Sequence, residues 1–235
     1  MGAQEAPARL LLTDRRIATY SRSEVAMPMA IQIEMFSDFI CPFCYIGFET
    51  VRKLKREFDL DIKWRGFQIH PDWPAEGMPA SEFRREMSPE TRRAIWDRIQ
   101  AMAEATGFAM KPPEILTNSR LALEAAEYAA EIGKGDAFEE RVYRAYFNEG
   151  LNIGQQGVIA ELAAEVGIDR DDLNVAIESN RYTMRLKNNA MVAHNRNVDG
   201  VPTFFIGEYP LVGAQSEDTM RRILSRYIHK LGAAK

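Results

Sequence analysis

The sequence predicts an α/β fold in which a small sheet is interrupted by an inserted α-helical subdomain. Three observations support this prediction: strand-forming sequence occurs at 31–36, a helical pattern runs from about 81 to 197, and strand-forming sequence returns at 202–212. Strand sequence on both sides of a long helical stretch indicates one sheet assembled from both ends of the chain. We therefore expect residues 29–75 and 182–235 to form the sheet-containing domain, and 76–181 to form the helical subdomain.

The first elements form a strand–helix–strand unit. Residues 31–36 (IQIEMF) alternate apolar and polar side chains, and Ser37 and Asp38 close this strand. The helix expected at 42–58 begins with a proline, which suits the first turn because no hydrogen-bonded N–H is needed there. A second strand is expected at 61–68. A strand–helix–strand unit of this kind builds a parallel pair of strands.

Helices dominate the middle of the chain, and strands return after them. The expected helices cover 89–106, 118–132, 136–148, 155–166, 170–178 and 181–196. Two short strands at 202–206 and 209–212 precede a closing helix at 216–228. The caps agree with this assignment, since Ser88 and Ser216 precede first turns that contain acidic residues.

Composition excludes several classes of partner. The chain has 235 residues and a formal net charge of −4, a balance that argues against binding nucleic acid. A membrane span needs about 18 apolar residues and a secretory signal an apolar stretch of about 7–15, and the sequence contains neither. We expect a cytoplasmic protein without a membrane partner. Residues 1–28 are expected to be a loosely ordered extension, or to reflect a misplaced start before Met27 or Met29.

The only two cysteines, Cys41 and Cys44, form a C-x-x-C motif at the first strand-to-helix junction. This position puts Cys41 at a helix N-terminus, where free N–H groups and the helix dipole favour the thiolate. Cys44 lies almost one turn further along and can reach the Cys41 sulfur. The spacing predicts an exposed nucleophile and a shielded resolving thiol, which is the arrangement that thiol–disulfide exchange requires.

The cysteine pair has two other interpretations, a zinc site and two inert buried cysteines. Tetrahedral zinc needs two further ligands, but the chain has no second cysteine pair, and His70, His194 and His229 lack ligand spacing. We therefore expect no metal site. Two inert buried cysteines are the other alternative.

A second motif, Gly200-Val201-Pro202, stands directly before the late strand. A cis Val201–Pro202 bond would turn the Val201 backbone outward, where its N–H and C=O could pair with an extended substrate. An ordinary trans turn is the alternative for an isolated proline. We predict the cis form.

These motifs together resemble those of one family. The stretch from Phe36 to Gly47 (FSDFICPFCYIG), the Gly200-Val201-Pro202 loop and the later Gly213-Ala214-Gln215 resemble the DsbA-like family, most closely its FrnE-type oxidoreductases. The resemblance implies a thioredoxin-like fold with a helical insertion, Cys41 as the nucleophile, Cys44 as the resolving thiol and Pro202 as the cis proline. Family members often carry tryptophan where this chain has Phe43, and some FrnE-type proteins have a second cysteine pair that is absent here.

The resulting functional prediction is a thiol–disulfide oxidoreductase with protein-disulfide reductase or isomerase activity. It would act on protein or small-molecule disulfides and thiols, without a bound metal or nucleotide, and glutathione is a candidate redox partner. The alternative is a glutathione-dependent enzyme similar to kappa-class transferases and 2-hydroxychromene-2-carboxylate isomerases. Those enzymes typically have serine where Cys41 stands. A non-catalytic binding module is the third interpretation.

Two further predictions concern the surroundings of the cysteines. Many family members carry a buried acid below the cysteines, and the resemblance places Glu34 there as a proton relay for Cys44, with a pKa raised by burial. The surface around Cys41, including Pro42 and Phe43, is expected to be apolar. The reason is that Phe39, Ile40, Phe43 and Tyr45 cannot all pack inward. The alternative is that the helical insertion covers them.

Overall fold

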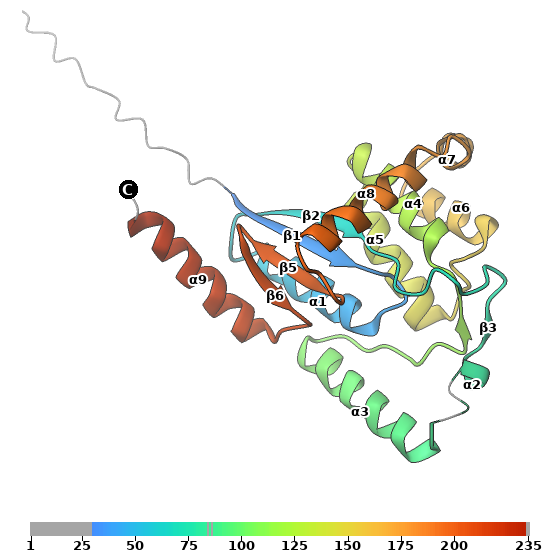
Figure 1. Ribbon diagram of the computed structural model, residues 1–235, viewed down its shortest axis with the longest axis horizontal. Coiled ribbons are helices and arrows are strands. Elements are labelled where there is room, and N and C mark those ends of the chain that lie inside the picture. Colours follow the sequence, from blue (N-terminus) through green and yellow to red (C-terminus); the bar gives the residue numbers. More distant parts are fainter. Residues whose placement is uncertain (1–29, 84, 86, 234–235) are drawn as a thin grey trace, which may run out of the picture.

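The computed structural model describes residues 30–83, 85 and 87–233, so the extension expected at 1–28 lies outside the described residues. Strand β1 (Ile31–Ser37) and strand β2 (Leu60–Gly66) pair in parallel, joined by helix α1 (Pro42–Leu54) as predicted. Strand β5 (Thr203–Ile206) pairs antiparallel with β1, and β6 (Tyr209–Val212) continues the sheet. The order β2-β1-β5-β6 therefore combines the two ends of the chain in one sheet (Figure 1).

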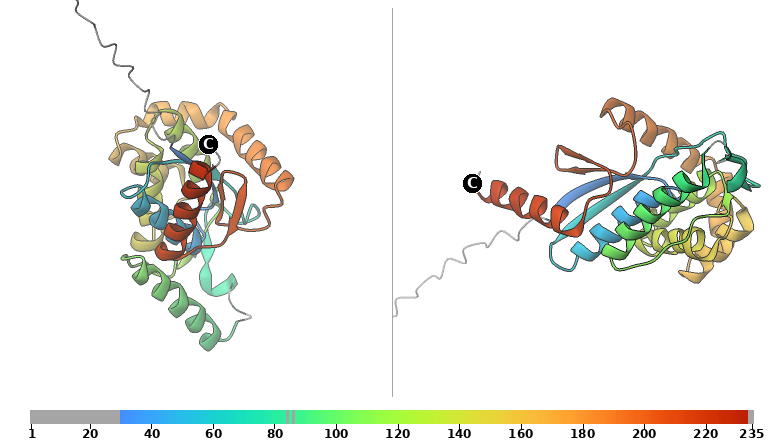
Figure 2. Two further views of the ribbon diagram at one scale, coloured as in Figure 1. Left: turned by 90° about the vertical axis from the view of Figure 1, so that its left-hand side faces the viewer. Right: turned by 90° about the horizontal axis from the view of Figure 1, so that it is seen from below.

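Helices cover both faces of this sheet. Helices α1 and α9 (Glu217–Ala233) pack together on one side, and α8 (Arg181–Asn195) lies on the other (Figure 2). Strand alternation decides which side chain meets which layer. Met35 points toward α1, whereas Phe36 and Phe205 belong to a separate buried cluster that contains Ala193 from α8. Neighbouring residues of β1 consequently face different helices.

The helical insertion surrounds α4 (Arg120–Glu131) and packs on the sheet through it. The insertion contains α3 (Pro89–Ala105), α5 (Gly135–Arg144), α6 (Gln156–Glu165) and α7 (Arg170–Glu178). Helix α4 contacts β2 as well as α5, α7 and α8. One continuous hydrophobic core runs from β1 and α1 into α4 and α5, so the insertion and the sheet share their buried side chains.

Several local features differ from the sequence-based expectations. A short strand pair, β3 (Met78–Pro79) with β4 (Ile115–Leu116), and a four-residue helix, α2 (Ala80–Phe83), connect the sheet to the insertion. Helix α1 ends at Leu54 instead of 58, because the next N–H groups, of Arg56 and Glu57, bond carbonyls only three residues back and the chain continues as a turn. A π-helical turn, η1 (Ala145–Glu149), extends α5. Within the described residues, no helix is both long and apolar enough to cross a membrane.

Candidate active site

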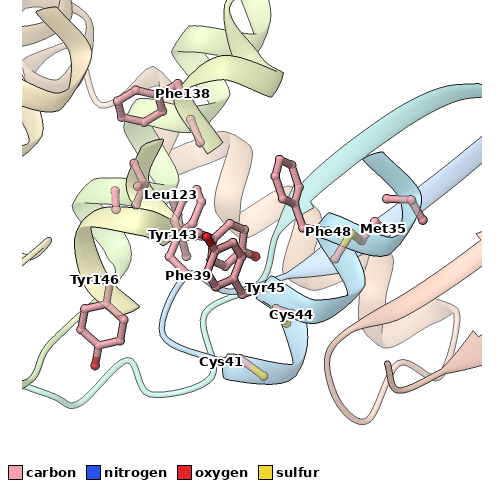
Figure 3. Close-up of a cluster of buried hydrophobic side chains, with 14 of the residues drawn as sticks. Met35, Phe39, Cys41, Cys44, Tyr45, Phe48, Leu123, Phe138, Tyr143 and Tyr146 are labelled. Atoms are coloured by element: carbon pink, nitrogen blue, oxygen red, sulfur yellow. The ribbon is translucent and has the colours of Figure 1, made fainter. Parts of the chain in front are cut away.

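Cys41 and Cys44 lie in the first turn of α1, close to the aromatic side chains of the core (Figure 3). Cys41 is the N-cap residue, with extended backbone angles (φ −91°, ψ 115°), and Pro42 occupies the first helical position. The N–H groups of Cys44 and Tyr45 bond the Cys41 carbonyl at 3.0 and 3.3 Å. Both thiols are free, so the structure presents the reduced dithiol.

Both cysteines are more enclosed than the sequence suggested. Cys41 is only 6% exposed and Cys44 is fully buried, so the prediction of an exposed nucleophile is wrong in degree. The Cys41 thiol lies 3.7 Å from the Val201 carbonyl oxygen, which covers one side of the sulfur. The order of exposure still distinguishes the two thiols, because only Cys41 retains any contact with solvent.

The environment shifts the two thiols in opposite directions. Hydrogen bonds from the Cys44 thiol and from the backbone N–H groups of Cys44 and Phe43 lower the pKa of Cys41, although burial opposes them. Burial raises the pKa of Cys44 well above its ordinary value, and the adjacent Cys41 raises it further. A helix N-terminus favours a thiolate at its first position, while a buried thiol stays protonated. Cys41 is therefore the better nucleophile of the pair.

The Val201–Pro202 peptide bond is cis. Pro202 lies against the middle of α1, where a Cβ at Gly47 would come within 3.3 Å of Pro202 Cγ and 2.8 Å of Phe204 Cζ. Its carbonyl accepts a 2.8 Å hydrogen bond from the Gly213 N–H. Residues from two distant segments of the sequence thus meet at the dithiol: the C-x-x-C helix and the loop before β5.

Glu34 does not lie with the cysteines, so its predicted placement is wrong. Its neighbour Met35 faces α1, and strand alternation turns Glu34 to the opposite side of the sheet. There Glu34 forms ion pairs with Arg65, at 2.5 Å, and with Arg196. Burial raises its pKa, but the two arginines and Lys63 outweigh burial and hold the pKa below its ordinary value. The predicted raised pKa is therefore wrong as well.

The buried acid nearest to the cysteines is Asp38, which the sequence analysis treated only as a strand-closing residue. Asp38 is fully buried, and its backbone N–H points at the Cys44 sulfur, 3.5 Å away. Its carboxylate accepts hydrogen bonds from the N–H groups of Ile69 at 2.8 Å and Ile40 at 3.3 Å. Burial raises the pKa of Asp38 to about 6, against the lowering effect of these bonds. An acid three residues before a C-x-x-C motif was the signal available in the sequence.

A hydrogen bond links the site to the helical insertion. The Ser37 hydroxyl lies 2.6 Å from the Tyr143 hydroxyl of α5, with both groups buried. The Tyr143 ring stacks on Tyr45 at a centroid distance of 4.9 Å with an interplanar angle of 3°, and its edge meets Phe39. The ring cluster in Figure 3 joins α1 to α5 through these contacts.

The same cluster corrects the reason given for an apolar surface around Cys41, namely that its aromatic neighbours cannot all pack inward. Phe39, Ile40 and Tyr45 all pack inward, and only Phe43 and Pro42 remain partly exposed. Phe39 stacks on Trp64, and Tyr45 contacts Phe108 and Phe147 of the insertion. The helical insertion supplies the covering partners, which was the alternative interpretation.

The fold and the paired cysteines define a thioredoxin-fold protein with a helical insertion and a C-x-x-C dithiol at a helix N-terminus. Residues 32–225 match the family described as the DSBA-like thioredoxin domain. The chain belongs to this family, and the resemblance seen in the sequence is confirmed at that level.

Two curated relatives differ in what is known of them. The uncharacterized protein YwbO of Bacillus subtilis is 28% identical over 201 residues, covering 84% of this chain and 97% of YwbO. The 2-hydroxychromene-2-carboxylate isomerase of Pseudomonas putida is 23% identical over 176 residues, covering 75% and 85% of the two chains. The family therefore includes an isomerase as well as oxidoreductases.

Two crystal structures share the fold. A probable DsbA oxidoreductase from Streptomyces coelicolor superposes with a TM-score of 0.77 at 22% identity, covering 83% of this chain and 89% of that one. The cytosolic disulfide reductase DsbM of Pseudomonas aeruginosa, in a structure with GSH, gives a TM-score of 0.64 at 19% identity, with coverage of 85% and 100%.

Proposed function

We propose that this protein catalyses thiol–disulfide exchange, with Cys41 as the attacking thiol and Cys44 as the resolving thiol. The observation that carries the proposal is the arrangement of the two thiols: Cys41 is the N-cap of α1, 3.7 Å from the Val201 carbonyl of the cis-proline loop, and Cys44 is buried in the first turn; the opposite pKa shifts of the two thiols agree with it. A low-pKa thiol beside a high-pKa thiol suits a reaction in which the first must attack and the second must wait for a proton acceptor. Membership of the DSBA-like family supports the same class of reaction.

The reaction begins when the Cys41 thiolate attacks one sulfur of a substrate disulfide. A Cys41–substrate disulfide forms, and the other substrate sulfur leaves as a thiolate that takes up a proton. Cys44 then loses its proton and attacks the Cys41 sulfur, which releases the second substrate thiol and leaves a Cys41–Cys44 disulfide. Two electrons pass from the dithiol to the substrate, and two molecules of a thiol such as glutathione return the protein to its reduced form.

Asp38 is the proposed acceptor of the Cys44 proton. The Asp38 backbone N–H lies 3.5 Å from the Cys44 sulfur, the charge of its carboxylate acts on Cys41, and this fully buried carboxyl, with a pKa of about 6, is mostly ionised at neutral pH. A general base is most effective when its pKa lies near the working pH. The Ser37 hydroxyl, which hydrogen-bonds the Cys44 thiol, provides a second polar group at the same sulfur.

The Val201 backbone is proposed to bind the substrate. Its carbonyl already lies 3.7 Å from the Cys41 sulfur, so a chain that pairs with it would be held beside the nucleophile. We propose protein or small-molecule disulfides as substrates and glutathione as the redox partner, supported by the DsbM structure with GSH. A cytoplasmic setting, as the sequence analysis expects, would favour reduction of the substrate, because cytosolic glutathione is strongly reducing.

A second candidate is a glutathione-dependent isomerase, which the Pseudomonas putida relative favours. In such an enzyme a paired resolving thiol would have no role. The two candidates therefore differ in what Cys44 does, and a single substitution can separate them.

The test uses wild type, Cys41→Ser and Cys44→Ser in an insulin-reduction assay with dithiothreitol as the electron source. Cys41→Ser should abolish turnover, and Cys44→Ser should accumulate a mixed disulfide visible as a mass increase on Cys41. Equal residual activity in both variants would contradict the assignment. An isomerase would instead act on its own substrate with glutathione and would keep that activity in Cys44→Ser.

A further inference from the structure

An apolar pocket of about 150 Å³ lies beside the dithiol, between the start of α1 and helix α3. Ile40 and Pro42, the residues on either side of Cys41, line it together with Trp96 and Ile99 of α3. Trp73, Pro113, Leu116 and Phe147 add further apolar lining. The two parts of the fold meet here, so the pocket combines the reactive helix with the insertion.

The size of the pocket limits what it can hold. An apolar cavity of about 150 Å³ accommodates one benzene molecule. A peptide segment or a glutathione molecule is several times larger. The pocket therefore fits a single ring or a branched aliphatic group that is attached to a larger substrate.

The pocket is open to solvent at one side. Phe83, Met87 and Ile95 line it and are 51%, 42% and 45% exposed. Large apolar side chains grouped at the mouth of a pocket are typical of a binding site. A ring entering from solvent would remove part of this apolar surface from water.

Two polar groups in the lining, the Trp96 indole N–H and the Arg92 guanidinium, indicate the chemistry of the ring. The Nε1–H of Trp96 is buried and has no acceptor among the described residues. A buried donor without an acceptor is costly, and an occupant that brings an acceptor would remove this cost. Arg92 also lines the pocket, where its positive charge, which also acts on the exposed Glu90 carboxylate two residues earlier, is available to an anionic occupant. Both groups favour an occupant with a carboxylate or a comparable acceptor.

We propose that this pocket binds an aromatic ring carrying a carboxylate, so that the protein prefers aryl disulfides of that class as small-molecule substrates. This inference rests on the proposed function of the dithiol. The Cys41 thiolate attacks the sulfur that bears the pocket-bound ring, and the other aryl thiolate leaves. Cys44 then resolves the mixed disulfide, and the dithiol is oxidised as the aryl disulfide is reduced to two thiols.

The experiment compares three disulfides in reactions with the reduced full-length protein. Dithiobis(nitrobenzoate) is a carboxylated aryl disulfide, dithiodipyridine is an aryl disulfide without a carboxylate, and oxidised glutathione has no ring. Each rate constant is divided by that for free dithiothreitol with the same compound, which removes differences in intrinsic reactivity. Wild type should show its largest ratio with dithiobis(nitrobenzoate) and its smallest with oxidised glutathione.

Three substitutions test whether binding of the ring in the pocket causes the differences between these ratios. Trp96→Phe keeps the ring but removes the donor, and should lower the ratio about tenfold for dithiobis(nitrobenzoate) only, as expected for a hydrogen bond to a charged group. Ile95→Trp fills the mouth and should lower the ratio for both aryl disulfides without affecting oxidised glutathione. Val175→Trp is the matched control, because Val175 is 68% exposed on α7 and does not line the pocket. Circular dichroism shows whether each variant is folded, and Arg92→Gln tests the carboxylate preference if Trp96→Phe does not fold.

The outcomes separate the two proposals. If wild type reduces all three disulfides but Ile95→Trp leaves their relative rates unchanged, the pocket does not bind the ring and this inference is wrong. The same conclusion follows if Trp96→Phe lowers all three rates equally. If wild type reduces none of the three, the proposed oxidoreductase function fails, and the inference about its substrate fails with it.

Discussion

Replacing Asp38 by asparagine tests whether Asp38 is a buried carboxylate with a raised pKa that accepts the proton of Cys44. In the folded protein burial raises the pKa of Asp38 from 3.8 to about 6. The unfolded chain therefore releases this proton at lower pH than the folded chain does, so the stability contributed by this group falls as pH rises from about 4 to about 6. The amide side chain of the Asp38→Asn variant cannot ionise, and the corresponding loss is absent from that variant.

The size of the effect follows from the shift. About two pKa units at about 1.4 kcal/mol per unit give a loss of about 2–3 kcal/mol in wild type between pH 4 and 7. The free energy of unfolding of Asp38→Asn minus that of wild type should therefore rise by about 2–3 kcal/mol over this range. The absolute stability of the variant also depends on the bonds to Ile40 and Ile69, which an amide can only partly replace. The change of this stability difference with pH depends only on the ionisation of Asp38, so it separates the effect of the charge from the effect of the altered hydrogen bonds.

The assay is urea unfolding followed by tryptophan fluorescence at several pH values, with Asp61→Asn as the control because Asp61 is exposed on β2. The kinetic counterpart is the rate at which Cys44 releases a mixed disulfide on Cys41. In wild type this rate should rise with an apparent pKa near 6, and in Asp38→Asn that rise should be lost while the initial attack is preserved. Parallel stability curves for the two proteins would refute the desolvation argument, and an unchanged resolution profile would refute the role as proton acceptor.

Three other substitutions give distinct outcomes. Gly47→Ala places a Cβ 2.8 Å from Phe204 and 3.3 Å from Pro202, so it should lower the free energy of unfolding by about 1–3 kcal/mol and lower insulin-reduction activity by displacing the loop. Gly157→Ala is the control, because a Cβ at Gly157 has open space. A Gly47→Ala protein with unchanged stability and activity would contradict the packing argument. Glu34→Gln should weaken the ion pairs with Arg65 and Arg196 and lower the free energy of unfolding by about 1 kcal/mol at neutral pH. This difference should disappear as pH falls through the lowered pKa of Glu34, while the rate of disulfide resolution stays unchanged. Slower resolution in stopped-flow measurements would support the original prediction that Glu34 is a proton relay. Burial and the nearby Asp136 raise the pKa of Glu139 to about 8, so the free energy of unfolding of wild type should fall between about pH 4.5 and 8. Glu139→Gln should remove this decline of about 4 kcal/mol, as measured by urea unfolding at several pH values. Identical pH profiles for the two proteins would show that Glu139 is not held neutral.

The position of the two cysteines at a helix N-terminus could be predicted because its signal is local. A C-x-x-C pair between an alternating strand and a proline-started helix places Cys41 at a helix N-terminus, whatever the rest of the fold does. The sheet was predicted for a similar reason. The alternating residues of β1 and the short strands β5 and β6 carry their periodicity in a few consecutive positions.

Side-chain placement around the cysteines depended on tertiary contacts that local patterns do not contain. Glu34 was assigned by analogy to a family position, but one step along a strand reverses the face, and Met35 occupies the side toward α1. Phe39 and Tyr45 find their partners in Trp64 and Tyr143, which are distant in the sequence. No periodicity of the first segment could reveal which part of the chain would cover it.

The remaining differences arise where the backbone departs from regular structure. The π-helical turn after α5 and the two-residue strands β3 and β4 have no periodic pattern of their own, because each is stabilised by the segment it meets. Asp38 belongs to the same group. In the sequence it is one more polar residue at the end of a strand, and only the fold encloses it beside Cys44.

The stack of Tyr45 on Tyr143 couples the helical insertion mechanically to the turn that carries the cysteines. Tyr45 follows the second cysteine directly, so any change of size or tilt at Tyr143 reaches the reactive turn through a rigid ring. Densely packed interiors transmit such changes because they contain little free space to absorb them. Exchanging the insertion with that of another family member would therefore alter the dithiol itself. A change in the size of either ring is therefore expected to need a compensating substitution in the other helix, so α1 and α5 have to be redesigned together.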